Sequence, residues 1–265
     1  MSLKHKIKNA AYFLVNVFSY FFPSPKASIL MYHSIGNNGV LFTVTTEDLE
    51  KQLIFLKKEK YNVIKLAELV EKLRNKEKIS SKTIVLTFDD AYRDNYLNAF
   101  PLLKKYNLPA TIFIPTAYIG KEMLNSEGKS IPVMTWQEAR EMEESGLVDF
   151  ASHSHTHPMM NRIAFEEFAN EIKTSENLLN QNLKRPVKIF SFPKGKFKPE
   201  HAEYLKRQGY LGAVTVKEGL VGPSDNLFTL KRNFIFSKGG FSQFKGKLGR
   251  SVEIINWLKK DEQNS

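Results

Sequence analysis

Short apolar segments alternate with segments of helical spacing along most of the chain, and this alternation constrains the fold more than any other feature. Strand-like runs of four to six residues lie at 28–32, 83–87, 109–114, 147–152, 187–192 and 211–214. Segments with the spacing of amphipathic helices lie at 46–56, 66–73, 96–106, 137–145, 165–182 and 199–208. Strands that alternate with helices pair in parallel through right-handed crossovers. The sequence therefore predicts a single α/β domain, folded as a distorted or incomplete (β/α) barrel with parallel strands.

The length of the chain sets the number of domains. Its 265 residues suffice for one large domain, and contents of 42% hydrophobic and 25% charged residues are ordinary for a soluble fold. We assign residues 28–265 to one catalytic domain and residues 1–27 to an N-terminal appendage with a linker. In the helix expected from residue 46, the apolar side is formed by Leu49, Leu53, Ile54 and Leu56.

The N-terminal appendage has a basic and then an apolar part. Lys4, Lys6 and Lys8 precede an apolar run over 10–22, which is too short to span a bilayer as a helix. The order resembles a signal peptide, but no clear cleavage site follows, and the Pro-Ser-Pro at 23–25 is typical of a helix stop. An uncleaved interfacial anchor, a cleaved signal and a helix packed on the domain remain open. We expect a membrane-associated or exported, cell-surface protein, and the cytoplasmic face stays open.

Charge and cysteine content limit the partners and the chemistry. A net charge of +11 and an isoelectric point near 9.5 favour contact with anionic surfaces, such as an anionic membrane. The lysines are spread along the chain without a nucleic-acid-binding motif, so a solvated basic surface is the alternative and no nucleic-acid partner is expected. No obligate protein partner is evident. Because the chain has no cysteine, metal ligands must come from His, Asp, Glu or backbone oxygen.

Polar residues follow three of the predicted strands directly. Asp89 and Asp90 follow 83–87, a histidine cluster follows 147–152, and a Pro-Lys-Gly segment follows 187–192. In parallel barrels the C-terminal strand ends converge on one face, where active sites are found. We therefore expect these three segments to form one site.

The residue types at these positions suit a divalent metal and a proton acceptor. Asp89 and Asp90 point in different directions at the end of an extended strand, so one can bind metal while the other takes protons; capping of the following helix is the alternative. His153 and His157 can converge on one ion, and with a carboxylate they make a three-ligand zinc set with an open position. His155 lies between them and is expected to point elsewhere.

Two motifs carry a family resemblance. Thr87-Phe-Asp-Asp90 together with Ser152-His-Ser-His-Thr-His-Pro158 resembles the paired motifs of the NodB-type polysaccharide deacetylases, carbohydrate esterase family four. The similarity extends over about residues 29–232 and is greatest to the poly-N-acetylglucosamine deacetylase branch; it includes the segments 30–34, 109–113, 134–136, 192–195 and 209–210.

The resemblance implies a role for each residue of the site. Asp90, His153 and His157 would hold a divalent metal, usually zinc, which activates water, and Asp89 would be the general base. The backbone N–H of Lys194, the residue after Pro193, would stabilise the oxyanion.

The chain departs from the common family pattern at three positions. No histidine follows His201, so His33 is the expected proton donor, with a loop histidine as the alternative. Ser191 stands where many members have an Arg that orients the base. Arg232 is the expected replacement, with a surface cation as the alternative. Ala91 replaces the Gly that often follows the Asp pair.

Aromatic residues and Pro193 are candidates for contacts with a sugar, because aromatic faces stack on pyranose rings. We assign substrate binding to Trp136, Pro193 and Tyr92, with core packing as the alternative for the aromatic residues; Phe42 and Tyr118 are weaker candidates of the same kind.

The predicted function is a metal-dependent hydrolase that removes N-acetyl groups from N-acetylglucosamine-type polysaccharide or its precursor. Two alternatives remain. The first is a carbohydrate-binding protein with the same fold and little or no turnover. The second is a deacetylase of a small or lipid-linked acetylated substrate.

Overall fold

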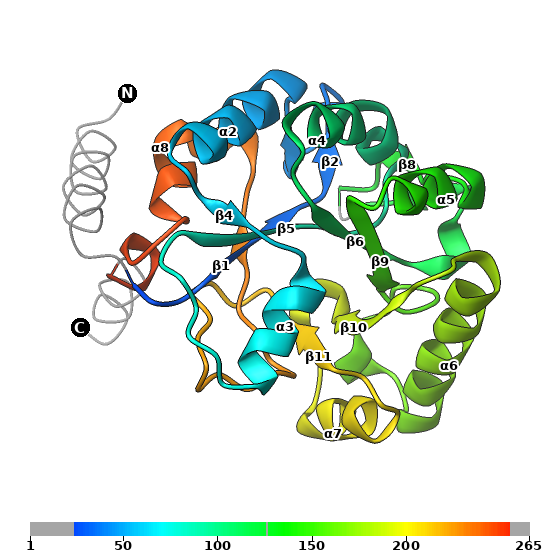
Figure 1. Ribbon diagram of the computed structural model, residues 1–265. Coiled ribbons are helices and arrows are strands. Elements are labelled where there is room, and N and C mark those ends of the chain that lie inside the picture. Colours follow the sequence, from blue (N-terminus) through cyan, green and yellow to red (C-terminus); the bar gives the residue numbers. More distant parts are fainter. Residues whose placement is uncertain (1–23, 126, 255–265) are drawn as a thin grey trace, which may run out of the picture.

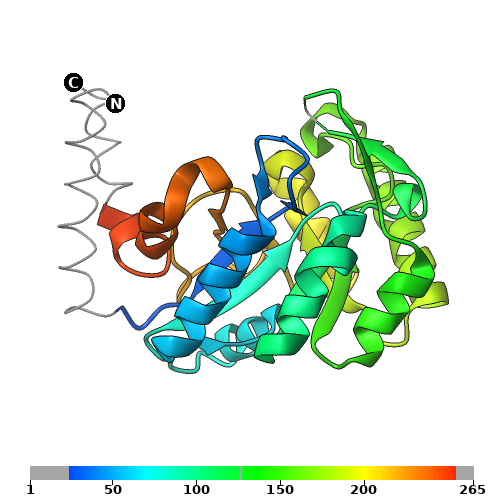
Figure 2. The ribbon, with the colours of Figure 1, turned by 90° about the horizontal axis from the view of Figure 1, so that it is seen from above.

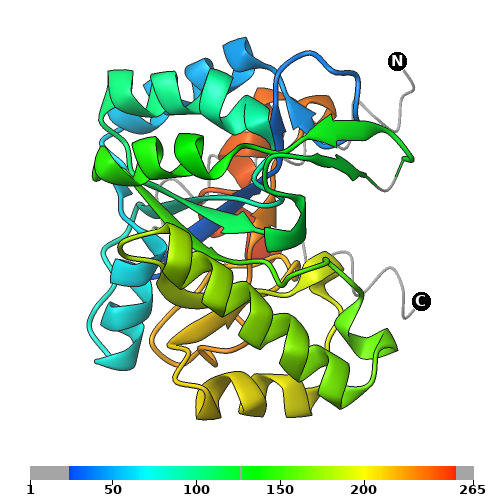
Figure 3. The same cartoon turned by 90° about the vertical axis from the view of Figure 1, so that its right-hand side faces the viewer.

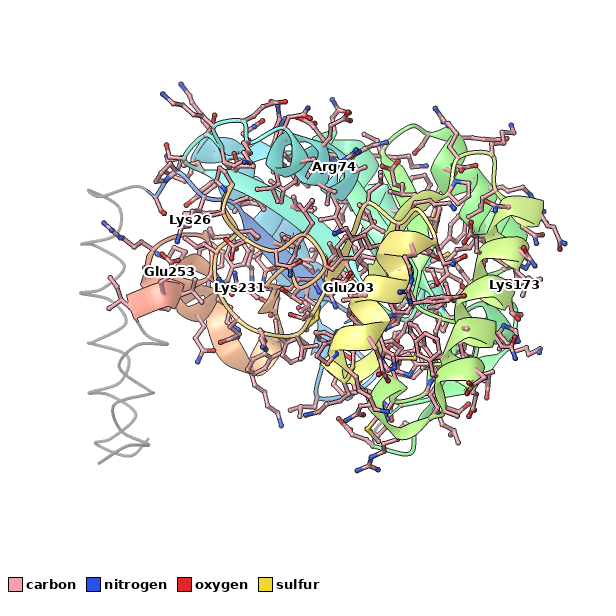
Figure 4. The ribbon with its side chains drawn as sticks, turned by 90° about the horizontal axis from the view of Figure 1, so that it is seen from below. Lys26, Arg74, Lys173, Glu203, Lys231 and Glu253 are labelled. Atoms are coloured by element: carbon pink, nitrogen blue, oxygen red, sulfur yellow. The ribbon has the colours of Figure 1, made fainter. Side chains whose placement is uncertain are left out.

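A computed structural model describes residues 24–125 and 127–254 of the chain. The predicted N-terminal anchor or signal therefore lies outside the described residues. Within the described part, no helix is both long and apolar enough to cross a membrane. Ala27, the last residue of the predicted linker, is buried and bridges Val221, and Lys26 forms an ion pair of 2.7 Å with Glu253. Figure 4 shows these two charged side chains next to each other, so the first and last described segments meet.

The centre of the domain is a curled parallel sheet (Figure 1). Its strands follow the order β11-β10-β9-β6-β5-β1-β12, and β4 pairs with the start of β5. The bounds are β1 Ser28–Tyr32, β4 Asn62–Val63, β5 Thr83–Phe88, β6 Ala110–Ile114, β9 Val148–Ser152, β10 Val187–Ser191, β11 Gly212–Val214 and β12 Asn233–Phe234. All these pairs are parallel, as predicted.

The sheet bends far enough for its two edges to approach each other. Thr215, just after β11, donates its N–H to Leu230 O at 2.8 Å, and Val214 bridges Leu230 in parallel. The chain from Leu230 then leads into β12, which pairs with β1. The fold is therefore an incomplete (β/α) barrel, which confirms the predicted fold class.

Helices surround the outside of the sheet (Figures 1 and 2). Their bounds are α2 Thr46–Lys58, α3 Leu66–Arg74, α4 Phe100–Tyr106, α5 Trp136–Glu144, α6 Phe165–Asn182, α7 Pro199–Arg207 and α8 Gly240–Gly246. Side-chain caps fix two of the starts: Thr45 accepts the N–H of Asp48 ahead of α2, and Thr135 with Glu138 forms a capping box ahead of α5. The segment predicted as one helix over 96–106 begins with a π-helical turn, Asn95–Ala99, before α4.

Alternate residues of each strand enter two different cores. Leu30 and Leu86 belong to the cluster that packs under α2, α4 and α5, whereas their neighbours Ile29 and Val85 pack with the apolar residues of α3. This period of two is what a strand buried on both faces requires. In α2 the predicted apolar stripe is correct except at Ile54, which is 44% exposed because successive helical residues point about 100° apart.

Several short elements were not predicted. A small parallel sheet joins β2 Ser34–Ile35 to β3 Thr43–Val44, and an antiparallel hairpin joins β7 Glu122–Leu124 to β8 Ser130–Pro132. The two-residue strands β4 and β12 and the short helix α8 were not predicted either. The hairpin projects beyond the C-terminal ends of the sheet strands, next to the loop over 36–42 (Figure 3).

Candidate metal centre and active site

The predicted site segments come together at the C-terminal ends of β5, β9 and β10. Each segment contains residues in the left-handed backbone conformation, which residues other than glycine rarely adopt. They are Asp90 and Ala91 (φ 71° and 49°) after β5, Ser154 and His157 (φ 67° and 60°) after β9, and Lys194 (φ 55°) after β10. Strained backbone of this kind collects at functional sites, where the surrounding structure fixes it.

Asp90, His153 and His157 lie together as candidate metal ligands. Their potential ligand atoms are all within 4.8 Å of one another. The Oδ1 atom of Asp90 is 3.6 Å from His153 Nε2 and 3.5 Å from His157 Nε2. His153 Nδ1 lies 2.8 Å from Ser191 O, which can only accept, so Nδ1 carries the proton and Nε2 offers its lone pair to the cluster.

This set of donors fits a divalent cation. Asp90 Oδ1 is buried and has no hydrogen-bond partner among the described residues. A buried carboxylate oxygen without a partner is unfavourable unless a cation or a donor is present. Two imidazoles and one carboxylate are a known zinc ligand set.

Burial lowers the pKa values of the His153 and His157 imidazoles. Desolvation lowers the pKa of His153 to about 4, against smaller opposing effects of the Asp89 and Asp90 carboxylates. Desolvation, together with the charge of Lys194, lowers the pKa of His157 to about 4. Both rings are therefore neutral at pH 7, which is the state a metal ligand needs.

The histidine loop is anchored by α6 rather than by the metal cluster. Glu171 accepts the N–H groups of His155 and Thr156 at 2.8 Å and 2.7 Å. The Nδ1 atom of His155 lies 2.9 Å from Thr116 Oγ1. The ring of His155 is thus engaged outside the cluster, as expected.

Asp89 is held by a buried arginine. Both terminal nitrogens of Arg232 lie 2.7 Å from the Asp89 carboxylate oxygens, in a two-pronged ion pair. Burial is the largest single influence on Asp89 and raises its pKa. The charge and hydrogen bonds of Arg232, together with the nearby His153 and His33, outweigh burial and hold the pKa well below its usual range. Arg232 is fully buried, so the alternative of a surface cation is wrong. Its Nη2 also donates to Ser191 Oγ at 2.9 Å, the residue that replaces the arginine of the common pattern.

One cavity of about 140 Å³ opens above these residues. It is lined by His33, Phe42, Asp89, Asp90, Tyr92, Met123, Leu124, Asn125, His153, His157, Lys194 and Val216. All three metal-ligand candidates, the predicted base Asp89 and the predicted proton donor His33 therefore line the same cavity. Burial and the nearby Asp90 carboxylate raise the pKa of Tyr92, so its hydroxyl keeps its proton.

His33 lies against two phenylalanines on the wall of the cavity. Its ring centroid is 5.5 Å from that of Phe42 and 5.4 Å from that of Phe234. The Nδ2 group of Asn95 donates to the His33 carbonyl at 2.7 Å and fixes its backbone. The Nδ1 atom is buried without a partner among the described residues.

Some of the residues predicted to contact substrate line the cavity, and others lie outside it. Tyr92 and Phe42 line the cavity. Trp136, the first residue of α5, is partly buried against the main core and is not among the lining residues, and neither are Pro193 and Tyr118. Four lining residues were missed, because Met123, Leu124 and Asn125 come from the unpredicted hairpin and Val216 follows the short β11.

Comparison with protein families assigns the chain. The polysaccharide deacetylase family matches residues 76–213, which include the Asp pair, the histidine cluster and the Pro-Lys-Gly turn. The chain belongs to the polysaccharide deacetylase family.

Individual relatives lie within the same family. The Bacillus subtilis protein YxkH is 30% identical over 207 residues, covering 78% of this chain and 70% of that protein. The poly-β-1,6-N-acetyl-D-glucosamine N-deacetylase of Staphylococcus epidermidis is 28% identical over 199 residues, covering 72% of this chain and 67% of that protein.

Solved structures share the fold. The Streptococcus pyogenes deacetylase PplD, in complex with acetate, has a TM-score of 0.73 at 27% identity and covers 85% of this chain and 99% of its own. IcaB from Ammonifex degensii has a TM-score of 0.77 at 21% identity, with 85% and 97% covered.

Proposed function

We propose that this protein is a divalent-metal-dependent N-deacetylase of N-acetylglucosamine polysaccharide. The observation that carries the proposal is the position of Asp89, held by Arg232, next to the cluster of Asp90, His153 and His157 in one cavity. The proton acceptor is a different residue from the metal ligands but lies close to them: Asp89 Oδ2 is 3.8 Å from His153 Nε2.

Asp90, His153 and His157 would hold the cation. A cation bound there would supply Lewis acidity, lowering the pKa of an attacking water molecule and polarising the acetyl carbonyl. The neutral imidazoles and the partner-free Asp90 Oδ1 support this assignment. We infer zinc from the ligand types, because imidazole with carboxylate is a common catalytic zinc set.

Asp89 would take the proton from water. Arg232 keeps its carboxylate ionised and fixes both oxygens, so one orientation persists at neutral pH. The lowered pKa also makes Asp89 a weak base. Proton transfer to it therefore requires an attacking water that is more acidic than bulk water.

His33 would act on the leaving amine, and Lys194 would act on the oxyanion. Both residues line the cavity with Asp89, so a substrate amide placed there can be reached from each side. The Lys194 N–H, in a left-handed turn after β10, would donate to the oxyanion of the tetrahedral intermediate. His33 would protonate the leaving amine as the C–N bond breaks, and this releases acetate.

A polymeric substrate suits the rim of the cavity. Leu124 is 69% exposed and Val216 is 40% exposed, and both line the opening. Exposed apolar side chains beside a polar cavity can cover the apolar face of a sugar ring while the acetamido group enters. The Staphylococcus relatives are poly-β-1,6-N-acetyl-D-glucosamine N-deacetylases, so β-1,6-linked N-acetylglucosamine is the first substrate to test.

The alternative of an idle binding protein loses one of its two supports. That alternative rested on the missing arginine before Pro193 and on the missing late histidine. Arg232, directly before β12, is ion-paired with Asp89 and would orient it in place of that arginine.

Acetate release tests the proposal. Purified zinc-loaded protein is incubated with β-1,6-linked N-acetylglucosamine oligomers, and acetate is measured with a coupled enzyme assay. We expect turnover that the Asp89→Asn variant loses, while Asp48→Asn on the surface of α2 behaves as the parent. Absence of acetate from every N-acetylated glycan, lipid-linked sugar and small amide would overturn the proposal.

The proposed location depends on residues outside the described part. We propose association with a membrane surface through the N-terminal segment. Fractionation of the full chain against a variant lacking residues 1–23 tests it, and equal recovery of both in the soluble fraction would contradict it.

A further inference from the structure

Asn125 sits at the mouth of the active-site cavity with an unused pair of hydrogen-bond donors. It follows β7 directly, is 9% exposed and lines the cavity. Its Nδ2 atom is buried and has no partner among the described residues. A buried amide nitrogen without an acceptor is unfavourable. Such a group in a native structure calls for an explanation.

The orientation of the Asn125 amide is fixed by its oxygen. Oδ1 accepts the N–H of Glu127 at 2.8 Å and that of Lys129 at 2.9 Å. A flipped amide would point an NH₂ group at these two donors, so the flip is excluded. The turn thus explains the oxygen of Asn125, since Asn often accepts from the backbone two residues on. It leaves the nitrogen unexplained.

The hairpin turn that carries Asn125 is braced from two directions. Within the turn, Gly128 donates its N–H to Asn125 O at 3.0 Å and has a left-handed φ of 74°. Across the cavity mouth, Leu41 donates its N–H to Glu127 Oε1 at 2.7 Å, and Lys129 Nζ donates to Gly39 O at 2.9 Å. Figure 3 shows the hairpin and the loop over 36–42 next to each other. The amide is therefore positioned before any ligand arrives.

The cavity concentrates unpartnered polar atoms. Among the described residues, six buried side-chain atoms lack a partner, and three of these belong to cavity-lining residues: His33 Nδ1, Asp90 Oδ1 and Asn125 Nδ2. Asp90 is already a candidate metal ligand, and its oxygen is as occluded as the nitrogen of Asn125 in the ligand-free protein. Occlusion of Nδ2 is therefore compatible with a role in binding.

We propose that Asn125 is a specificity-determining residue whose Nδ2 donates to an oxygen of the bound N-acetylhexosamine. The inference rests on the proposed function and adds a hydrogen-bond donor to the sugar on the wall formed by the hairpin. An acceptor is required, and every sugar hydroxyl and acetamido carbonyl offers one. A site built to bond a substrate oxygen discriminates against analogues that lack it, because the protein donor is then left unpaired.

Two substitutions separate the donor from the turn. Asn125→Asp keeps the acceptor oxygen of the turn and replaces the donor, and Asn125→Ser keeps a short acceptor without adding charge. Asn226→Asp is the matched control, because Asn226 Oδ1 also accepts a turn N–H, from Phe228 at 2.9 Å, but the residue is exposed and outside the cavity lining. Thermal unfolding of each variant checks that it is folded.

Binding is measured without turnover, by calorimetric titration of the zinc-loaded Asp89→Asn protein with a β-1,6-linked N-acetylglucosamine pentamer. We expect each Asn125 variant to bind about tenfold more weakly, as the loss of one hydrogen bond predicts, and the Asn226 variant to bind as the parent does. Binding of both Asn125 variants within twofold of the parent overturns the proposal and leaves the deacetylase function standing. Failure of the parent to bind the pentamer overturns the glycan assignment and this proposal together.

A second readout needs no Asn125 variant in the titration itself. The side-chain amide signal of Asn125 is assigned by its absence from the nuclear magnetic resonance spectrum of Asn125→Asp. On addition of the pentamer we expect this signal to shift in the Asp89→Asn protein. An unmoved signal at saturating pentamer contradicts the proposal.

Discussion

Replacement of Arg232 by methionine is the perturbation that most sharply probes the base. Arg232 makes five hydrogen bonds with its guanidinium: two to Asp89, and one each to Thr87 Oγ1, Ser191 Oγ and Thr215 O. Methionine keeps an apolar stem beside Phe113, over which the guanidinium lies at 5.5 Å. The variant therefore removes the charge and the donors while it preserves much of the packing.

The expected cost follows from the burial of both partners. Arg232 is fully buried and Asp89 is 3% exposed, so removal of the Arg232 side chain leaves a largely buried carboxylate without its bound guanidinium. Breaking a buried pair in this way costs about 3–5 kcal/mol. Without Arg232, burial raises the pKa of Asp89 in the folded state. The variant therefore keeps more of its stability at low pH and loses it as pH rises through the raised pKa.

Chemical denaturation between pH 4.5 and 8 measures this effect. We expect Arg232→Met to be destabilised by about 3–5 kcal/mol at pH 7 and by less at pH 4.5. Arg93→Met is the control, because Arg93 pairs with Glu138 at 2.8 Å but is 51% exposed, and such a pair contributes at most about 1 kcal/mol. The acid limb of kcat/KM is expected to move to higher pH in Arg232→Met. A loss below 1 kcal/mol with an unchanged pH profile refutes the role of Arg232.

Four further predictions concern the site. Zinc affinity is expected to stay level from pH 8 to 6 and to fall below about pH 5, because His153 and His157 have pKa values lowered to about 4; an affinity that falls between pH 8 and 6 contradicts this. In the metal-free protein, these lowered pKa values contribute stability above pH 6.5 that is lost as pH falls towards 4, which thermal unfolding with a chelator measures. Gly195→Ala is expected to cost about 1–3 kcal/mol, because Gly195 has φ 63° and an added Cβ would lie 2.3 Å from Val216 Cγ2; unchanged denaturation refutes it. His33→Gln is expected to lower kcat about 100-fold with zinc content intact, and a loss below threefold contradicts a role as proton donor.

The fold could be predicted from sequence because its strands are buried on both faces. Apolar runs such as 83–88 and 110–114 stand out against the helical spacing around them, and their predicted bounds differ from the observed ones by one residue. The hairpin Glu122–Pro132 could not be predicted in this way. Only Met123 and Ile131 are buried in its two strands, so no apolar pattern marks it.

The site was predictable where the chain places its residues directly after strands. Asp89, Asp90, His153 and His157 all meet this condition, and the structure brings them together. The pairing of Arg232 with Asp89 joins residues 143 positions apart and depends on the curl of the sheet. Sequence reasoning could name Arg232 as a replacement but could not distinguish it from a surface cation.

Trp136 and Asn125 mark the remaining difference. The sequence named Trp136 as a substrate-contact candidate because of its aromatic ring, with core packing as the alternative. The structure shows that it begins α5 and packs against the core. The sequence does not mark Asn125 as a site residue, because an Asn before Ser-Glu-Gly is typical of a turn. Whether Asn125 can bind a ligand depends on which of its side-chain atoms the turn leaves without a hydrogen bond, and the sequence does not show this.

The metal content and turnover of matched variants test whether Asp90, His153 and His157 hold a metal while Asp89 acts as the base. Zinc per chain is measured by mass spectrometry after dialysis of the parent, Asp89→Asn and His157→Gln proteins, and acetate release is measured on the same samples. We expect about one zinc in the parent and in Asp89→Asn, turnover in the parent alone, and neither zinc nor turnover in His157→Gln. Zinc retained by His157→Gln together with turnover, or turnover retained by Asp89→Asn, would contradict it.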